Sequence, residues 1–550
     1  MNGAEAFVAT LRHWGVDTFF GLPGSTEAPL LEAFREDGGI RYVLALHEGV
    51  AVAMADGYAR ATGKPGVVGL HTTVGTMNGM SQLFNSAKDG VPVVMTAGHK
   101  DTLVLAEDGF CSLPDLASLL RSFTKRSRQA LSAETIAAEL ARALAVATAN
   151  PTGPTFLAVP EDMMERALPT PLDLDSLPGV AGPVAPGPGP QGAIEATAAL
   201  IAQASRPVLV LGTAAAGAVV PASRLAQDAG MAVMAADLTD LARLDYPGDG
   251  QGYLGVYGDD QEALKGCDLV LAVGCRAFYP FSARLRPRLP PGAALVHIHP
   301  DPAELGTRVA TRLAIPADPG TALEAVVRAH HRLQDGRRAD GRRTYLREVE
   351  GKRARSLEEE LTSRAGRTPV EVAEVASHLA GALPDGTILV EESVRASKLI
   401  FRHCGVPRNG EIWRSSGGAL GWGLPAAVGA KLGRPDRPVV VLLGDGTLHF
   451  SVQALWSAVS QEAPLVAVVL DNGGYLAVKR AIENLLEVPV DPRHHPGTDI
   501  VGVDHTAAAR AYGAQAVVAT TAAEAAEAVR TALLANRVSV VVVPVAKIRP

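Results

Sequence analysis

The sequence predicts an α/β protein of three domains, each built on a doubly wound parallel sheet. Three observations carry this prediction. The chain has 550 residues, which is several times the length of an ordinary single domain. Short apolar runs recur along it and alternate with segments of helical spacing, as buried parallel strands joined by helices do. A stretch rich in proline and glycine and a strongly charged stretch divide these runs into three groups.

The first domain is expected over residues 1–170. Helical spacing is clearest at residues 49–62, between two of the apolar runs. The runs that predict its buried strands cover residues 16–24, 42–48, 66–72, 91–98 and 154–160.

The second domain is expected over residues 190–330, after a linker at residues 178–190 that reads PGVAGPVAPGPGP. A charged stretch at residues 330–360 follows it and predicts a solvated connector or a surface helix rather than an interaction tail. The runs that predict its strands cover residues 206–212, 231–237, 268–274 and 294–300.

The third domain is expected over residues 365–550. Two of its runs end directly in polar or glycine-containing motifs, which are described below. The runs that predict its strands cover residues 387–393, 437–446, 465–472 and 538–545.

Composition excludes several classes of function. Basic and acidic residues nearly balance, at 51 and 58, and no basic block marks a nucleic-acid footprint. The N-terminus has helical spacing and an early acidic Glu5, unlike a basic and then apolar signal peptide. Four cysteines without a CxxC pair cannot form a disulfide framework for this length. We expect a cytoplasmic protein with no membrane and no nucleic-acid partner.

The strongest chemical signal is a pair of motifs at predicted strand ends. Gly444, Asp445 and Gly446 follow one apolar run directly, and Asp471 and Asn472 follow another after 24 intervening residues. Ligands bind at the carboxyl ends of parallel strands, where glycines let the backbone approach a phosphate. Carboxylate and amide oxygens suit Mg²⁺. A tight turn and an Asx turn are the structural alternative.

This motif pair resembles the cofactor-binding motif of the thiamine-diphosphate (ThDP) dependent decarboxylase and acetolactate synthase superfamily. The likeness extends over essentially the whole chain and is greatest to the benzoylformate decarboxylases. It implies a pyrimidine-binding domain, a central domain and a diphosphate-binding domain, in that order. Four blocks carry it: FGLPGSTE (20–27), LALHEGVAVAMADGYAR (44–60), GLHTTVGTMNGM (69–80) and GGALGWGLPAAVGA (417–430).

The resemblance assigns the cofactor-binding residues. Glu48 matches the glutamate that bonds N1′ of the aminopyrimidine and activates the cofactor; a helix-surface glutamate is the alternative. Gly418 should present its carbonyl to the 4′-amino group, and Leu420 should hold the two cofactor rings in a bent shape. The diphosphate is expected at Gly444, Gly446 and Thr447, with Tyr475 also at the cofactor. The Mg²⁺ ligands are expected to be Asp445, Asn472 and the carbonyl of Gly474.

Ser25 and His71 match the serine and one of the two histidines that benzoylformate decarboxylases place over the cofactor. A helix N-cap for Ser25 and a strand-end cap for His71 are the structural alternatives. The sequence departs from the pattern where the second histidine is expected, since a gapless alignment puts Phe281 there. The substrate wall also differs, because Ala481 stands where the relatives have a bulky aromatic residue.

The resemblance implies non-oxidative decarboxylation of a 2-oxo acid, with a carboligase side activity favoured by the missing histidine. The alternatives are an acetolactate-synthase-like carboligase and a catalytically weak ThDP-binding paralogue. The implied cofactors are ThDP and Mg²⁺, and FAD in the central domain stays open. The substrates are a 2-oxo acid and an acceptor aldehyde. The family solution places one cofactor between the domains of two subunits, so a homodimer at least, and a homotetramer, is expected.

Overall fold

The computed structural model describes residues 1–179, 186–237, 252–257, 264–279, 288–333, 336–487 and 495–546. The chain folds into two compact units. Residues 1–183, 390–395 and 415–550 form one unit, and residues 184–389 and 396–414 form the other. Three six-stranded sheets carry the architecture, which confirms the predicted α/β class with doubly wound parallel sheets.

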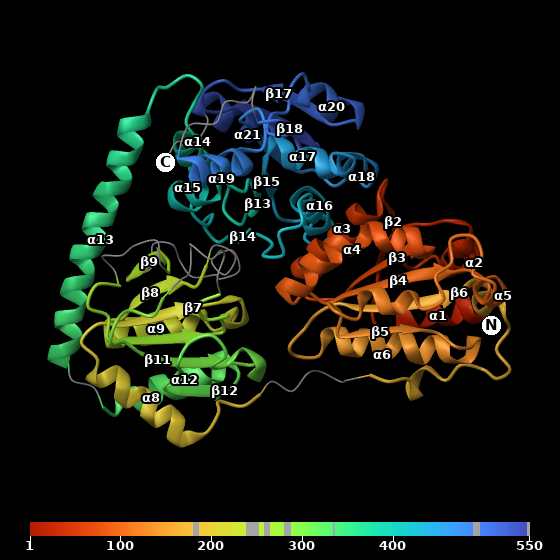
Figure 1. Ribbon diagram of the computed structural model, residues 1–550, viewed down its shortest axis with the longest axis horizontal. Helices are drawn as coiled ribbons and strands as arrows, with labels where there is room; N and C mark the ends of the chain where they lie inside the picture. Colours follow the sequence, from red (N-terminus) through yellow and green to blue (C-terminus); the bar gives the residue numbers. More distant parts are fainter. Residues whose placement is uncertain are drawn as a thin grey trace. The chain divides into compact units, whose positions relative to one another are not determined.

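The first sheet has the strand order β2-β1-β3-β4-β6-β5, and every pair in it is parallel. Helices α1 and α6 cover one face, and α3 and α4 cover the other (Figure 1). Its strands are β1 (Thr18–Leu22), β2 (Arg41–Leu44), β3 (Gly66–His71), β4 (Val93–His99), β5 (Arg126–Gln129) and β6 (Thr155–Pro160). Its helices are α1 (Gly3–His13), α2 (Ala28–Asp37), α3 (Glu48–Thr62), α4 (Thr72–Asp89), α5 (Thr102–Ala106), α6 (Ile136–Thr148) and α7 (Glu161–Glu165).

Alternating side chains of these strands explain why both faces are covered. Phe19 points to the cluster that includes Leu11 of α1 and Leu140 of α6, whereas the next residue, Phe20, contacts the ring of Tyr58 on α3. Successive residues of a strand face opposite sides of its sheet. An uninterrupted apolar run is therefore the expected sequence for a strand with helices on both sides.

The second sheet has the order β12-β11-β10-β7-β8-β9. Most of the charged stretch lies in the long helix α13 (Gly336–Arg364), which buries Leu346 and Val349 against this domain's core. The strands are β7 (Pro207–Leu211), β8 (Ala232–Ala235), β9 (Tyr253–Val256), β10 (Leu269–Val273), β11 (Ala294–His299) and β12 (Leu313–Pro316). The further helices include α8 (Gln191–Gln203), α9 (Val219–Ala229) and α12 (Pro319–His331).

The third sheet has the order β14-β13-β15-β16-β18-β17. The motif-bearing strands β15 and β16 are neighbours and run in parallel. The strands are β13 (Ile388–Glu392), β14 (Glu411–Trp413), β15 (Val439–Gly444), β16 (Val466–Asp471), β17 (Gln515–Val518) and β18 (Ser539–Pro544). The helices are α14 (Val372–Ala380), α15 (Ser397–His403), α16 (Gly423–Gly433), α17 (Asp445–Ser451), α18 (Ala454–Ser460), α19 (Leu476–Leu486), α20 (His505–Ala511) and α21 (Ala522–Ala535).

Helices α3 and α16 approach each other closely because glycines face carbonyl groups where they cross. A Cβ atom on Gly57 would lie 2.1 Å from the carbonyl oxygen of Ala426, and one on Gly429 would lie 2.0 Å from that of Met54. Neither position has room for a larger side chain. This contact joins the helix that begins with Glu48 to the helix that follows the Gly418 loop.

Candidate active site

Three loops at one edge of the first sheet carry its predicted site residues. β2, β1 and β3 are adjacent and parallel, so their carboxyl ends open at the same edge. Ser25 follows β1 in the short helix η1 (Ser25–Glu27), and His71 is the last residue of β3. Glu48 follows β2 as the first residue of α3. The fold thus gathers the three residues at one edge.

His71 is held by a buried carboxylate that the sequence analysis did not single out. Its Nδ1 lies 3.0 Å from Oε2 of Glu27 and 3.0 Å from Oγ1 of Thr26. Glu27 is 4% exposed, whereas the side chain of His71 is 24% exposed. We assign the ring proton to Nδ1, because that nitrogen faces the carboxylate. Nε2 is then the nitrogen with a lone pair for proton transfer.

Two glycines make room for this pair. A Cβ atom on Gly24 would lie 2.2 Å from Nδ1 of His71, and one on Gly98 would lie 2.0 Å from Oε1 of Glu27. The Gly24 N–H also donates to Oε2 of Glu27 at 2.8 Å. Since Gly24 precedes η1 as its N-cap and Glu27 precedes α2, Ser25 caps neither helix. Ser25 is an exposed residue and directly precedes Thr26 and Glu27, the partners of His71.

Glu48 is positioned by the neighbouring helix α4. Nδ2 of Asn78 donates to Oε2 of Glu48 at 3.0 Å, and a Cβ atom on Gly75 would lie 3.3 Å from Oε1. The residue is partly buried. A carboxylate fixed in this way keeps accepting capacity for a further N–H group, as the role implied by the resemblance requires.

The same helix holds the loop with Gly418 and Leu420. Nε2 of Gln82 donates to the Leu420 carbonyl at 2.9 Å. Asn85 donates to the carbonyl of Ala419 at 2.8 Å and accepts from its N–H at 3.1 Å. These contacts lie within one chain and one compact unit. They fix the backbone of the loop in which the Gly418 carbonyl and the Leu420 side chain are expected to contact the cofactor.

A buried ionic network anchors both ends of this loop. Arg60 bonds Asp56 at 2.6 Å and Asp89 at 2.7 Å, with all three side chains nearly or fully buried. Nε1 of Trp422 donates to Asp56 at 2.9 Å, and the N–H of Ser416 donates to Asp89 at 3.0 Å. One cation with two carboxylates satisfies the buried charges through hydrogen bonds, so the loop is rigidly placed.

The third sheet brings the two sequence motifs together. Gly444 ends β15 and Asp445 begins α17, while Asn472 directly follows β16. Burial raises the pKa of Asp445, and the nearby Asp471 carboxylate raises it further. Oδ2 of Asp445 and Oδ1 of Asn472 are both buried and lack a hydrogen-bond partner within the described ranges.

Close packing surrounds this pair. Thr447 is 4% exposed. A Cβ atom on Gly446 would lie 2.8 Å from the ring of Tyr475, and one on Gly474 would lie 2.3 Å from the carbonyl of Thr498. The φ angle of Gly474 is +147°, a conformation that favours glycine. The predicted diphosphate and metal residues therefore occupy one crowded set of strand ends.

The donor atoms of Asp445 and Asn472 suit a divalent cation. A buried carboxylate oxygen without a partner is costly, and a cation at this place would satisfy both orphan oxygens. Carboxylate and amide oxygens are ligands that Mg²⁺ accepts.

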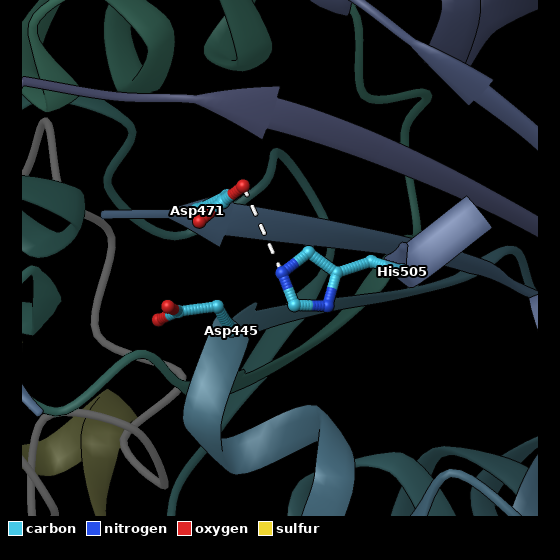
Figure 2. A group of neighbouring side chains, drawn as sticks. All are labelled: Asp445, Asp471 and His505. Atoms are coloured by element: carbon cyan, nitrogen blue, oxygen red, sulfur yellow. Dashed lines mark ion pairs between the residues drawn. The ribbon is translucent and has the colours of Figure 1, made fainter. Parts of the chain in front are cut away.

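A third polar group faces the same place. Nε2 of His505 lies 3.7 Å from Oδ2 of Asp471, and its Nδ1 lies 2.9 Å from Nε2 of His449. His505 lowers the pKa of Asp471, and Asp471 raises the pKa of His505. Figure 2 shows His505 and Asp471 pointing toward each other beside Asp445.

Three family models match the chain along its length. They are described as "Thiamine pyrophosphate enzyme, N-terminal TPP binding domain" over residues 1–119, "central domain" over residues 194–326, and "C-terminal TPP binding domain" over residues 396–543. Together the matches cover more than half of the 550 residues. The chain belongs to the thiamine pyrophosphate enzyme family. The resemblance inferred from the motifs is therefore confirmed, and the family cofactor is ThDP.

Relatives of this thiamine pyrophosphate enzyme include decarboxylases and synthases. The chain is 33% identical to benzoylformate decarboxylase from Pseudomonas aeruginosa over 98% of both chains. It is 27% identical to an acetolactate synthase large subunit from Haemophilus influenzae, over 86% of this chain and 82% of the other. The crystal structure of benzoylformate decarboxylase from Polynucleobacter necessarius superposes with a TM-score of 0.85 and 27% identity over 100% of both chains.

Several residues of the enzyme's site escaped the sequence analysis. Glu27 lies inside one of the motif blocks, but its partner His71 lies on another strand. Only the knowledge that the two strands end at the same edge of the sheet could have paired these residues. Asn78 also lies in a motif block, but no feature of the sequence marks it as a partner of Glu48. His449 and His505 have no motif at all.

Phe281 lies outside the described residues, so the alignment that places it at the position of the second histidine stays a prediction. Within the described ranges, none of the helices combines the length and the apolar character that a membrane span requires.

Proposed function

We propose that this enzyme catalyses the ThDP- and Mg²⁺-dependent, non-oxidative decarboxylation of a 2-oxo acid. The observation that carries the proposal is the pair of buried orphan oxygens on Asp445 and Asn472, at the ends of adjacent strands. Such a pair would hold a divalent cation, which would neutralise the charge of a bound diphosphate. The similarity to benzoylformate decarboxylases supports the reaction class.

In this proposal Asp445, Asn472 and the carbonyl of Gly474 hold Mg²⁺. Gly444, Gly446, Thr447 and Tyr475 surround the diphosphate, and Gly418, Leu420 and Glu48 receive the aminopyrimidine and the ring junction. When bound, ThDP supplies a nucleophilic carbon and an electron sink for the bond that breaks beside the carbonyl.

The chain's own residues provide placement and proton control. The Glu48 carboxylate, steadied by Asn78, holds or releases a proton at the aminopyrimidine. His71 can accept a proton at Nε2 and return it, because Nδ1 is occupied by its hydrogen bond to Glu27. An imidazole nitrogen can both accept and donate a proton, so it can serve as general base and general acid in one cycle. Ser25 is exposed beside it and can bond the substrate carboxylate.

The substrate is proposed to be an aromatic or otherwise bulky 2-oxo acid. Residues Tyr475 to Val478 form the start of α19, and the side chains of Tyr475 and Val478 are 36% and 46% exposed. Exposed apolar side chains beside the diphosphate motif can pack against a bulky substituent. With Ala481 in place of an aromatic residue, the substituent would be held differently from that of benzoylformate.

A carboligase of the acetolactate synthase type is the second candidate. The similarity to acetolactate synthase large subunits favours it. So does Phe281, since a chain without a second proton donor would protonate and release the aldehyde product more slowly, which would favour reaction with an acceptor carbonyl. In that case an added aldehyde would divert much of the product into a 2-hydroxy ketone.

The proposal includes a homodimer, with a homotetramer as its further assembly, in the cytoplasm. Val74 and Met77 on α4 are 48% and 51% exposed, close in sequence to Asn78, which bonds Glu48. Large exposed apolar side chains at this place fit burial by a second copy of the chain. The domains proposed are 1–170, 190–330 and 365–550.

The decisive experiment is a panel of 2-oxo acids assayed with and without acceptor aldehydes, followed by product analysis. Protein stripped of cofactor should regain activity only with ThDP and a divalent cation together. Full activity after exhaustive removal of both would contradict the proposed function. Light scattering of the reconstituted protein gives its oligomeric state, and the visible absorbance of the purified protein tests for FAD, since a bound flavin would colour it yellow.

A further inference from the structure

The first turn of α4 lies beside the two residues that handle protons in the proposed function. His71 directly precedes the helix, which begins at Thr72. A Cβ atom on Gly75 would lie 3.3 Å from Oε1 of Glu48. Asn78, in the second turn, donates to Oε2 of the same carboxylate. The start of this helix therefore belongs to the active site, although the motifs gave it no role of its own.

Among the described residues, the N-terminus of α4 has neither a side-chain cap nor an acidic residue. The first N–H groups of an α-helix have no acceptor within the helix. The N-cap residue of α4 is His71, whose side chain makes no capping hydrogen bond, and the first turn contains no aspartate or glutamate. The helix has 18 residues, so its N–H groups and the positive end of its dipole favour an anion at this place.

An independent feature points to a ligand at the same turn. Thr72 and Thr73 are the first two residues of α4 and are 0% and 7% exposed. Oγ1 of each is buried and has no hydrogen-bond partner in the part of the chain that the structure describes. Thr76 differs, because its hydroxyl donates to the Thr72 carbonyl at 2.7 Å. An unsatisfied buried hydroxyl costs free energy, so two of them in one turn indicate a polar ligand.

The backbone at Thr72 is also strained. Its φ angle is +47°, in the left-handed region that a β-branched residue rarely adopts. Residues in such conformations cluster at active sites and ligand-binding sites, where the surrounding structure holds them in place. The strain and the two unpaired hydroxyls both lower the stability of this turn, and a role in binding explains why both are present beside His71.

We propose that the first turn of α4 binds the carboxylate of the 2-oxo acid, through its N–H groups and the hydroxyls of Thr72 and Thr73. The inference rests on the proposed function, because both reactions considered there use a 2-oxo acid. Helix N-termini bind anions, and hydroxyl groups donate to carboxylates. A carboxylate has about four acceptor positions, so Ser25 can bond it at the same time. Two unpaired hydroxyls that serve no ligand are the alternative.

Neutral donors suit this carboxylate better than a lysine or an arginine would. During decarboxylation the bond to the carboxyl carbon breaks, CO₂ leaves, and the electron pair of that bond stays with the rest of the molecule. The negative charge is therefore lost from this place. A group that binds the carboxylate more tightly than the transition state slows the reaction. Backbone N–H groups and hydroxyls orient the carboxylate with partial charges only, which keeps this penalty small.

Removal of the two hydroxyls tests the proposal. The double variant Thr72→Val, Thr73→Val, called the valine variant, keeps the shape of both side chains. For the best 2-oxo acid of the panel, kcat/KM should fall about 10- to 150-fold in this variant, the factor that one hydrogen bond to a charged group supplies. The double variant Thr72→Ser, Thr73→Ser retains both hydroxyls and should retain most of the activity. Thr76→Val, which removes a hydroxyl that already has a partner, is the matched control.

Binding of phenylacetate and phenylacetamide gives a readout besides activity. The two probes have the same shape, and only phenylacetate carries a charge. Calorimetry with the protein loaded with ThDP and Mg²⁺ should show that the wild type prefers phenylacetate. This preference should fall at least about tenfold in the valine variant and not in Thr76→Val. Loss of two unpaired hydroxyls should raise the melting temperature of the valine variant rather than lower it, which separates the effect from a folding defect.

The outcomes separate the inference from the proposed function. An unchanged kcat/KM in the valine variant, or an equal loss of phenylacetate and phenylacetamide binding, would overturn the inference alone, since neither result indicates recognition of the charge. If the wild type with ThDP and a divalent cation converts none of the 2-oxo acids, the proposed function is overturned, and the inference with it.

Discussion

Replacing Glu27 by glutamine isolates its effect on His71. Oε2 of Glu27 lies 3.0 Å from Nδ1 of His71 and accepts the Gly24 N–H at 2.8 Å. An amide has the same shape, and its oxygen can take the place of Oε2, which accepts from both N–H groups. Its NH₂ group then stands where Oε1 of Glu27 accepts from the Thr26 hydroxyl at 3.0 Å, and the Nδ1–H of His71 loses its charged partner.

The expected magnitude follows from the burial of this pair. Glu27 is 4% exposed, so solvent does little to replace the lost interaction. A hydrogen bond to a charged group contributes about 1.5 to 3 kcal/mol. Because 1.36 kcal/mol corresponds to a tenfold change in rate, kcat/KM should fall about 10- to 150-fold.

A double-mutant cycle shows whether Glu27 acts through the histidine. Steady-state decarboxylation would be measured for the wild type, Glu27→Gln, His71→Ala and the double variant. In the His71→Ala background the Glu27→Gln change should cost less than about twofold, since no ring remains to be held. Glu32→Gln, on the exposed face of α2, is the matched control. An equal loss in both backgrounds would refute the reasoning.

Three further predictions concern other parts of the enzyme. Glu48→Gln should keep ThDP bound but slow hydrogen/deuterium exchange at the reactive cofactor carbon, and an unchanged exchange rate would contradict the role of Glu48. Gly57→Ala should destabilise the fold by about 1 to 3 kcal/mol, because the new methyl group meets a carbonyl of α16; Gly192→Ala, with open space around it, should leave the melting temperature nearly unchanged. Burial raises the pKa of Glu392 from 4.5 to about 7. Between these pH values the folded protein keeps the proton, whereas the unfolded chain has released it. The free energy of unfolding therefore falls as the pH rises through that window. As the pH rises from 5 to 8, the free energy of unfolding of Glu392→Gln should therefore increase by about 1 to 3 kcal/mol relative to that of the wild type. Urea denaturation measures this difference, and a parallel pH dependence of the two proteins would contradict the assignment.

The inner strands of all three sheets were predictable, and most edge strands were not. Each predicted run corresponds to a strand, from β1 to β18. Among the described residues, five of the six edge strands, β5, β9, β12, β14 and β17, were missed. β5 reads Arg126–Gln129 and is polar throughout. An inner strand is buried on both faces and must be apolar, whereas an edge strand forms through its hydrogen bonds to one neighbour and needs no such pattern.

The charged stretch shows the same limit from the other side. Its sequence predicted a solvated connector or a surface helix, and most of it folds as α13. Leu346 and Val349 are buried, but so many charged residues surround them in the sequence that no clear apolar stripe marks the buried face of the helix. Only the presence of a sheet beneath decided which face of this helix is buried.

The sequence by itself determined the three-sheet α/β architecture, the family and the strand ends at which chemistry can occur, because buried apolar runs and the glycine and carboxylate motifs after them are local features. The tertiary structure alone decided which side chains meet there. Glu27 with His71, Asn78 with Glu48, and His505 with Asp471 each join different elements. Such pairs depend on strand order and on helices that cross, and a linear pattern does not contain distances between segments far apart in the chain.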